Sequence, residues 1–88
     1  MKIADLIREF CEETDGCEVY ENYSGRGMFG RTCMGIVVEK DFSYMKMIVK
    51  LTRFLDRNDF DNPESELEGM MMDSLGLDTI IYFPNIQG

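Results

Sequence analysis

The segment from Ser24 to Arg31 is the part of this chain whose residue types are best suited to recognition. It contains three of the eight glycines and two of the nine basic residues. Glycine adopts backbone conformations that are closed to other residues and lets a partner approach closely. Arginine presents a planar set of donors that matches a carboxylate or a phosphate. These residue types therefore indicate a binding loop on an otherwise acidic protein.

Two interpretations of this loop stay open. In the first, a β-hairpin needs the glycines for its geometry, and Arg26 and Arg31 are merely solvated. In the second, the arginines bind an anion or an acidic surface, and Met28 and Phe29 anchor an interface unless they tuck under the loop. Nucleotide hydrolysis is disfavoured, because the loop leads into a strand and lacks the Walker spacing and its lysine.

A second group of basic residues recurs at intervals of four, three and four. This spacing places the side chains on one face of a helix, and the residues are Lys46, Lys50, Arg53 and Arg57. The plain interpretation is a solvated face whose ion pairs add less than about 1 kcal/mol each. The functional interpretation is an electropositive strip that engages an acidic partner and is continuous with the glycine-arginine loop.

The net charge of −8 is unevenly distributed along the chain. Residues 58–88 contain seven acidic residues and no basic residue, whereas residues 23–57 contain seven basic and three acidic residues. A net-negative protein is repelled by phosphates, so direct nucleic-acid binding is disfavoured. The acidic ends could instead imitate nucleic acid toward a basic groove of a partner. The candidate acids for this role are Asp59, Asp61, Glu64, Glu66 and Glu68.

Neither catalysis nor metal binding is indicated by the residue types. The chain has three cysteines and no histidine, so the usual base that activates a nucleophile is missing. Cys11, Cys17 and Cys33 form no CxxC pair and lack the spacing of zinc ligands. Their odd number argues against a disulfide framework and fits free thiols in a reducing cytosol. The sequence therefore predicts a protein that is not an enzyme and has no cofactor.

The methionines have two interpretations. Eight occur in 88 residues, and three of them are consecutive at Met70, Met71 and Met72. They could be adaptable core residues or a pliable hydrophobic contact surface. Consecutive helical residues lie about 100° apart, so in a helix at least one of the three must be exposed or lie in an oligomer interface. A monomer and a homodimer both remain possible.

Hydrophobic periodicity predicts the elements that position these residues. Apolar residues at helical spacing predict a helix over about 2–14, and strands are predicted over 18–23 and 32–39 as a hairpin around the loop. In the first strand, Val19, Glu21 and Tyr23 alternate with Glu18, Tyr20 and Asn22, and the buried face is left open. The second strand is apolar on both faces, which is typical of a central strand.

The second half of the chain is predicted to contain two helices and a strand. A cap at Asp41 or Ser43 begins a helix that runs to about Arg57. A third helix is predicted to begin at Pro63 and to end at Gly76, with core contacts from Leu67, Met70, Met71 and Leu75. A last strand over 79–83 is expected to pair beside the central strand.

These elements predict a single α+β domain over residues 1–88. Its expected architecture is a three-stranded, mostly antiparallel sheet with helices packed on it, in the order α-β-β-α-α-β. No apolar run approaches the roughly 20 residues of a membrane helix. An acid near the N-terminus stands where a signal peptide would be apolar, so a cytoplasmic location is expected.

The segment from Tyr20 to Gly30, followed by Cys33 and Gly35-Ile36, resembles a pattern found in small proteins of bacteriophages and prophages. The resemblance covers a small part of the chain, implies a mobile-element origin, and transfers no functional residue. Small acidic phage proteins are often inhibitors of host defence systems, including anti-CRISPR proteins. The sequence and the resemblance together favour a phage-encoded binding protein that occupies a surface of a host protein. The alternative is a small-ligand module in which Arg26 and Arg31 hold a nucleotide or a phosphorylated metabolite.

Overall fold

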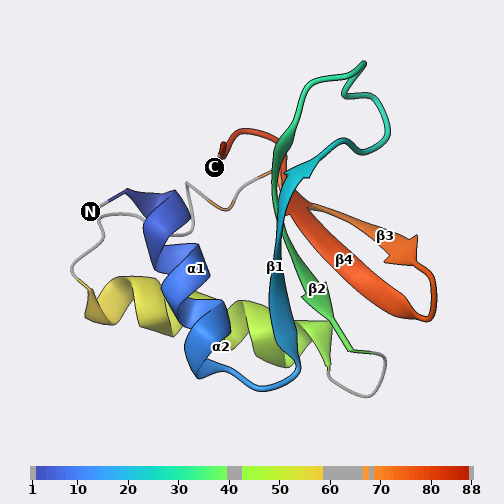
Figure 1. Ribbon diagram of the computed structural model, residues 1–88. Coiled ribbons are helices and arrows are strands. Elements are labelled where there is room, and N and C mark those ends of the chain that lie inside the picture. Colours follow the sequence, from blue (N-terminus) through green and yellow to red (C-terminus); the bar gives the residue numbers. More distant parts are fainter. Residues whose placement is uncertain (1, 40–42, 59–66, 68, 88) are drawn as a thin grey trace.

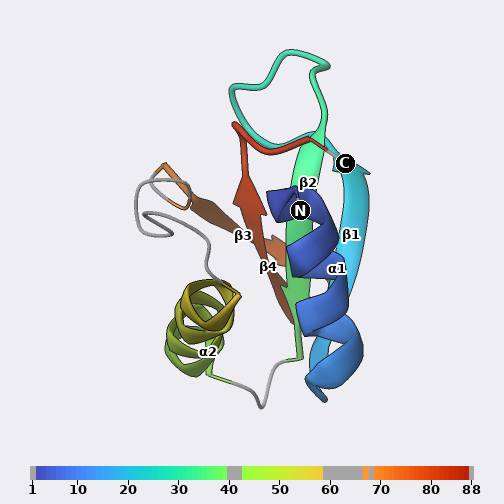
Figure 2. The ribbon, with the colours of Figure 1, turned by 90° about the vertical axis from the view of Figure 1, so that its left-hand side faces the viewer.

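The computed structural model describes residues 2–39, 43–58, 67 and 69–87. The order of its elements is α1 (Ile3–Glu13), β1 (Cys17–Tyr23), β2 (Cys33–Val38), α2 (Tyr44–Arg57), β3 (Met71–Leu75) and β4 (Asp78–Phe83). Both helices lie on one side of a single sheet, as the two views in Figures 1 and 2 show. The predicted α+β class is confirmed, although the sheet and the order of its elements differ from the prediction.

Both helices form where the apolar spacing predicts them. In α1 the side chains of Leu6, Ile7 and Phe10 are buried, and in α2 those of Met47, Leu51, Phe54 and Leu55 are buried. Ser43 caps α2, because its side chain accepts a hydrogen bond from the Lys46 backbone N–H at 3.4 Å. Asp41, the other predicted cap, lies outside the described residues.

The sheet has four antiparallel strands in the order β1-β2-β4-β3. As predicted, β2 is central and the last strand pairs beside it. Met34, Ile36 and Val38 of β2 belong to the main core with the helices, whereas Cys33 and Val37 belong to a smaller cluster on the other face. Apolar residues on both faces of β2 thus serve two separate clusters.

The predicted third helix does not extend to Gly76. Leu67 is helical and buried in the main core, as predicted, but the chain is no longer helical from Gly69 onward. Residues Met71–Leu75 form β3, which pairs with β4 through a tight turn at Gly76 and Leu77. Met71 and Leu75 are four residues apart, a spacing that puts them on one face of either a helix or a strand. Gly69 has a φ of 85°, which ends any helix before β3. The order is therefore α-β-β-α-β-β with four strands; the predicted helix start at Pro63 lies outside the described residues.

The alternation of side chains along β1 is interrupted by a bulge. The register between β1 and β2 shifts between Tyr20 and Tyr23, and Asn22 adopts a φ of 59°. A bulge adds one residue and reverses the faces beyond it. Val19 therefore packs against the main core, whereas Tyr23 packs against the smaller cluster on the other face. This bulge leads directly into the loop between β1 and β2.

Candidate functional site

The glycine-arginine loop, residues 24–32, is anchored to the sheet by the buried side chain of Met28. The side chain of Met28 is only 2% exposed and packs with Cys33, Ile80 and Tyr82. Its Sδ atom lies 3.1 Å from the Gly25 backbone N–H nitrogen, which donates to it, and 3.8 Å from Cys33 Sγ. Met28 thus tucks under the loop, the alternative that the sequence left open, and is an anchor rather than an exposed contact.

The backbone of the loop is shaped by two successive turns around Met28. The Met28 N–H donates to the Gly25 carbonyl at 3.3 Å, and the Arg31 N–H donates to the Met28 carbonyl at 3.0 Å. Gly25 also lies against the ring of Tyr82, where an added Cβ would be 2.5 Å from Cζ. A side chain at position 25 would therefore have to displace the Tyr82 ring. The loop therefore has a defined conformation that its glycine and methionine impose together.

Phe29 is presented to solvent at the tip of this loop. Its side chain is 97% exposed, and its φ is 53°. A bulky residue in the left-handed region costs about 1–2 kcal/mol. Burial of a phenylalanine side chain would stabilise the folded protein by roughly 1.5–3 kcal/mol, and the exposed Phe29 does not contribute this free energy. Strained backbone of this kind clusters at functional sites, so Phe29 is the leading candidate for a contact residue.

The two arginines of the loop lie beside this tip. The Arg26 side chain is 87% exposed, and its Nε lies 3.7 Å from Asp73 Oδ2 of β3. An exposed pair at that distance contributes little. Arg31 is exposed, and its Nε donates to the Met28 carbonyl at 3.4 Å. Both guanidinium groups are therefore accessible to an anionic group of a partner.

Three tyrosines support the base of the loop on the face of the sheet away from the helices. The rings of Tyr20 and Tyr23 are 5.4 Å apart, edge to face, and those of Tyr23 and Tyr82 are 4.9 Å apart. Burial, followed by the nearby charge of Asp73, raises the pKa of Tyr23. The Tyr23 phenol therefore stays protonated near neutral pH. The packing role of the three tyrosines agrees with the geometry of aromatic pairs in small cores.

The basic residues of α2 lie on the other side of the sheet from the loop cluster. Lys46, Lys50, Arg53 and Arg57 are all exposed on the helix. The continuity predicted between this strip and the loop is absent among the described residues, because α2 belongs to the main core and Met28 to the smaller cluster. The arginines of the loop and the basic residues of α2 therefore face solvent on opposite sides of the sheet.

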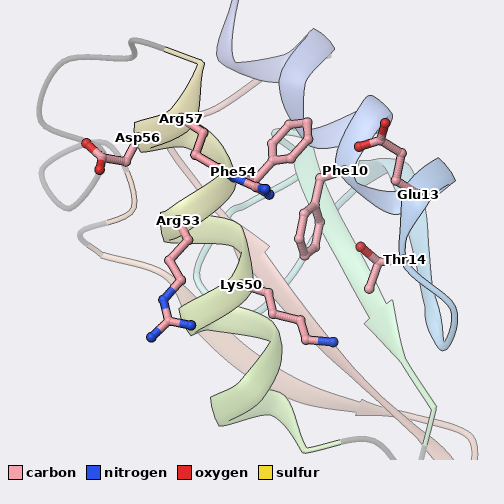
Figure 3. Close-up of a pocket in the computed structure, with 8 residues that line it drawn as sticks. All are labelled: Phe10, Glu13, Thr14, Lys50, Arg53, Phe54, Asp56 and Arg57. Carbon is pink, nitrogen blue, oxygen red and sulfur yellow. The ribbon is translucent and has the colours of Figure 1, made fainter.

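A groove between α1 and α2 runs beside three of these cations. Its volume is about 590 Å³, and Lys50, Arg53 and Arg57 line one wall. Phe10 and Phe54 lie at its base with ring centroids 5.6 Å apart. In Figure 3, Lys50 and Arg57 extend toward α1, whereas Arg53 and Asp56 point away from it. Sequence reasoning identified the strip but missed the groove, because the groove depends on how the two helices cross.

The acidic candidates near the predicted third helix are not placed by the structure. Asp59, Asp61, Glu64, Glu66 and Glu68 all lie outside the described residues. Their predicted role as an imitation of nucleic acid stays a prediction.

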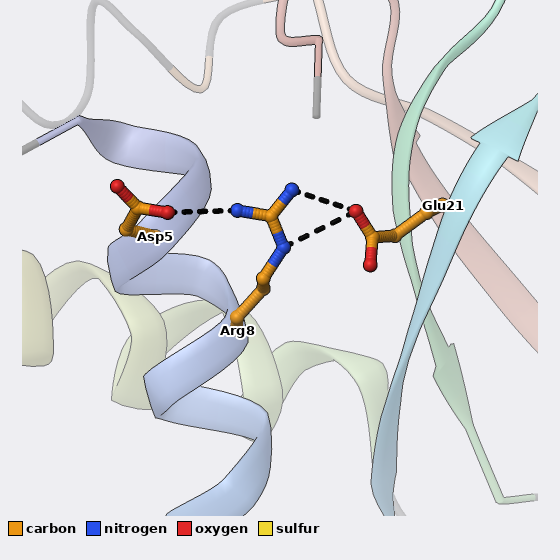
Figure 4. Close-up of polar contacts among 3 residues, drawn as sticks. All are labelled: Asp5, Arg8 and Glu21. Carbon is orange, nitrogen blue, oxygen red and sulfur yellow. Dashed lines mark hydrogen bonds and ion pairs between the residues drawn. The ribbon is translucent and has the colours of Figure 1, made fainter.

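A salt-bridge network joins α1 to β1, and sequence reasoning missed it. Arg8 Nη2 donates to Glu21 Oε1 at 2.6 Å and Arg8 Nη1 donates to Asp5 Oδ1 at 2.8 Å, as Figure 4 shows. The hydrogen bond from Arg8 lowers the pKa of Glu21, and the same bond raises the pKa of Arg8. The i, i+3 spacing of Asp5 and Arg8 was visible in the sequence, but the distant partner Glu21 was not. The network is a solvent-exposed polar contact between α1 and the edge strand β1.

The three cysteines are buried and free. Burial raises the pKa of Cys11 to about 12, and it also raises the pKa values of Cys17 and Cys33. A thiol of this kind is a poor nucleophile at neutral pH. Within the described ranges, no three acidic or cysteine side chains are grouped so that they could hold a metal ion. None of the helices in those ranges has the length and apolar character needed to span a bilayer.

Comparison with protein-family models, curated proteins and solved structures gives no match to this chain.

Proposed function

We propose that this protein is a non-enzymatic binding protein that acts by occupying a surface of another protein. Its contact surface is the tip of the glycine-arginine loop. One observation carries the proposal: Phe29 is almost fully exposed in a left-handed conformation, while the adjacent Met28 is buried and fixes the loop. A loop held in one conformation loses little entropy on binding.

The chemistry of the tip specifies the kind of surface that it fits. Phe29 supplies an aromatic anchor, which suits an apolar pocket on the partner. Arg26 and Arg31 flank it with accessible guanidinium groups. Carboxylates around the pocket would pair with them and accelerate association. The partner surface is therefore an apolar pocket with an acidic rim.

The resemblance to phage proteins gives this proposal its biological setting. We propose that the partner is a host protein, such as a component of a defence system, and that occupation of its surface inhibits it. The acidic segments of the chain could add contacts to a basic region of the same partner.

Affinity capture from a bacterial lysate tests the proposal when it is done with matched variants. Phe29→Ala removes the anchor, and Leu77→Ala removes another apolar side chain, 83% exposed, at the β3–β4 turn. We expect the wild-type protein and Leu77→Ala to retain the same host protein and Phe29→Ala to lose it. Equal retention by Phe29→Ala would contradict the proposal.

The small-ligand alternative has its own signature. Because both guanidinium groups are accessible, a nucleotide bound by Arg26 and Arg31 would raise the melting temperature of the protein. A thermal shift with nucleotides that Arg26→Ala abolishes, together with no captured protein, would replace the first proposal by this one.

A further inference from the structure

We propose that the groove between α1 and α2 is a second binding site, which takes a small organic phosphate. Its volume of about 590 Å³ lies in the range typical of small-molecule sites, roughly 300–1,000 Å³. The loop is a protruding tip, whereas the groove is hollow. The inference does not depend on the proposed role of the loop.

The base of the groove suits an apolar body. Phe10 and Phe54 approach edge to face and are largely buried, so only a limited aromatic surface is open to the groove. A flat or aliphatic group could cover that surface and exclude water from it. This base distinguishes the groove from a bare patch of surface charge.

The wall formed by α2 suits an anionic head group. Lys50 and Arg57 extend toward α1 over the groove in Figure 3, and Arg53 lies between them in sequence. Lysine is a compact charge and arginine a planar donor group, a combination that matches the oxygens of a phosphate. The head group is therefore expected at the α2 wall, between Lys50 and Arg57.

The pairing of the arginines supports this assignment. The chain has 17 acidic and nine basic residues, and Arg8 contacts two carboxylates. Within the described part of the chain, Arg53 and Arg57 have no carboxylate within ion-pair distance. They are four residues apart on one helix face, where like charges destabilise a helix. Of the two, Arg57 extends toward α1 over the groove, where a bound anion would supply the opposite charge that the described carboxylates do not.

Two carboxylates also line the groove, and one of them, Glu13, sets the orientation of the ligand. Asp56 points away from α1, and Glu13 lies on the α1 wall opposite the cations. Glu13 would repel a second anionic group at that end, while the Thr14 hydroxyl beside it can donate or accept a hydrogen bond. The site therefore favours a ligand with one phosphate and an uncharged far end.

Titration of the full chain with phenyl phosphate, followed by NMR, tests the inference. Phenyl phosphate carries one anionic head group and one aromatic body, and benzyl alcohol and inorganic phosphate serve as probes that each lack one part. We expect saturable shifts at Phe10, Thr14 and Arg57, and weaker binding of both partial probes. The double variant Lys50→Gln/Arg57→Gln should weaken phenyl phosphate binding by about 10-fold or more, as loss of charge-assisted contacts does. Lys2→Gln, which removes an exposed cation outside the groove, should leave the affinity unchanged.

The outcomes that overturn the inference are distinct. They are equal affinity of the double variant and the wild-type protein, a matching loss with Lys2→Gln, or no saturation up to about 10 mM phenyl phosphate. Circular dichroism checks that the exposed double substitution leaves the fold intact, and the single variants Lys50→Gln and Arg57→Gln replace it if it does not. Protein capture through Phe29 is measured separately, so failure at the groove leaves the proposal for the loop standing.

Discussion

The two faces of the sheet are packed in different ways. On one face, α1 and α2 bury a large apolar cluster that includes Ile7, Met34 and Leu51. On the other face, a small cluster of Met28, Cys33, Ile80 and Tyr82 is built partly from the loop itself. Most of the stability therefore comes from the helix side, while the few residues of the loop side fix the position of an exposed tip. Stability and recognition are separated by one layer of strands.

The largest effect is expected on the helix side. Leu51→Ala creates a cavity between α2 and the sheet at a fully buried position and should lower the free energy of unfolding by about 3–5 kcal/mol. Urea denaturation measures this change. A smaller loss of unfolding free energy than substitutions in the loop-side cluster cause would show that the helix side does not supply most of the stability.

A somewhat smaller effect is expected from the loop anchor. Met28→Ala removes a buried side chain near the surface, where the loop can partly collapse, so the loss should be about 2–3 kcal/mol. Phe29→Ala, one residue away, should change the free energy of unfolding by less than about 0.5 kcal/mol because the side chain touches solvent. The same denaturation measurement compares the two.

Alkylation of the thiols shows where the Met28→Ala protein has changed. In the wild-type protein all three cysteines should react slowly near pH 8, because each is buried and burial raises the pKa of each thiol, that of Cys11 to about 12. Met28→Ala should expose Cys33, whose Sγ lies 3.8 Å from Met28 Sδ, and leave Cys11 and Cys17 protected. Equal exposure of all three would mean that the two faces do not act independently.

Alanine substitutions at two of the three loop glycines, Gly25 and Gly27, should destabilise the protein for different reasons. Gly25→Ala places a Cβ 2.5 Å from the Tyr82 ring, and the resulting overpacking should cost about 1–3 kcal/mol. Gly27 has a φ of 76° and open space around it, so Gly27→Ala should cost only the backbone strain of about 1–2 kcal/mol. NMR of the Tyr82 ring separates the two, because only Gly25→Ala should displace it. An unchanged Tyr82 spectrum in Gly25→Ala would show that the loop does not rest on this ring.

The smallest effect is expected from the salt bridge on the edge strand. The hydrogen bond from Arg8 lowers the pKa of Glu21 from its usual value of 4.5. The contribution of Glu21 to stability is therefore present above pH 4.5 and is lost as the pH falls through the lowered pKa of the folded protein. In the Glu21→Gln protein the urea midpoint should therefore fall less steeply below about pH 4.5 than it does in the wild-type protein. An identical pH dependence in the wild-type and Glu21→Gln proteins would remove this role.

The sequence predicted those elements whose apolar spacing fits only one structure. The helical spacing of Ile3, Leu6, Ile7 and Phe10 fits a helix alone, and the β-branched run Ile36–Val38 fits a strand. The strand β3 was missed because Met71 and Leu75 satisfy both spacings, and only pairing with β4 decides between them.

The candidate site was predictable in part for the same physical reason. The glycines and arginines indicated a loop. Met28 and Phe29 are adjacent apolar residues in that loop, and no sequence periodicity shows which of them is buried. That Met28 lies inward and Phe29 outward follows from the cluster with Cys33 and Tyr82, which come from distant positions in the chain. The groove likewise depends on the crossing of α1 and α2, which local patterns do not encode.

Photo-cross-linking from the loop tip tests the central claim most directly. A benzophenone side chain is placed at position 29, and a control carries it at position 77, which is also exposed. Irradiation in a host lysate should join the position-29 protein to one host protein and give no such product from position 77. A product from position 77 and none from position 29 would contradict the assignment of Phe29 as the contact residue.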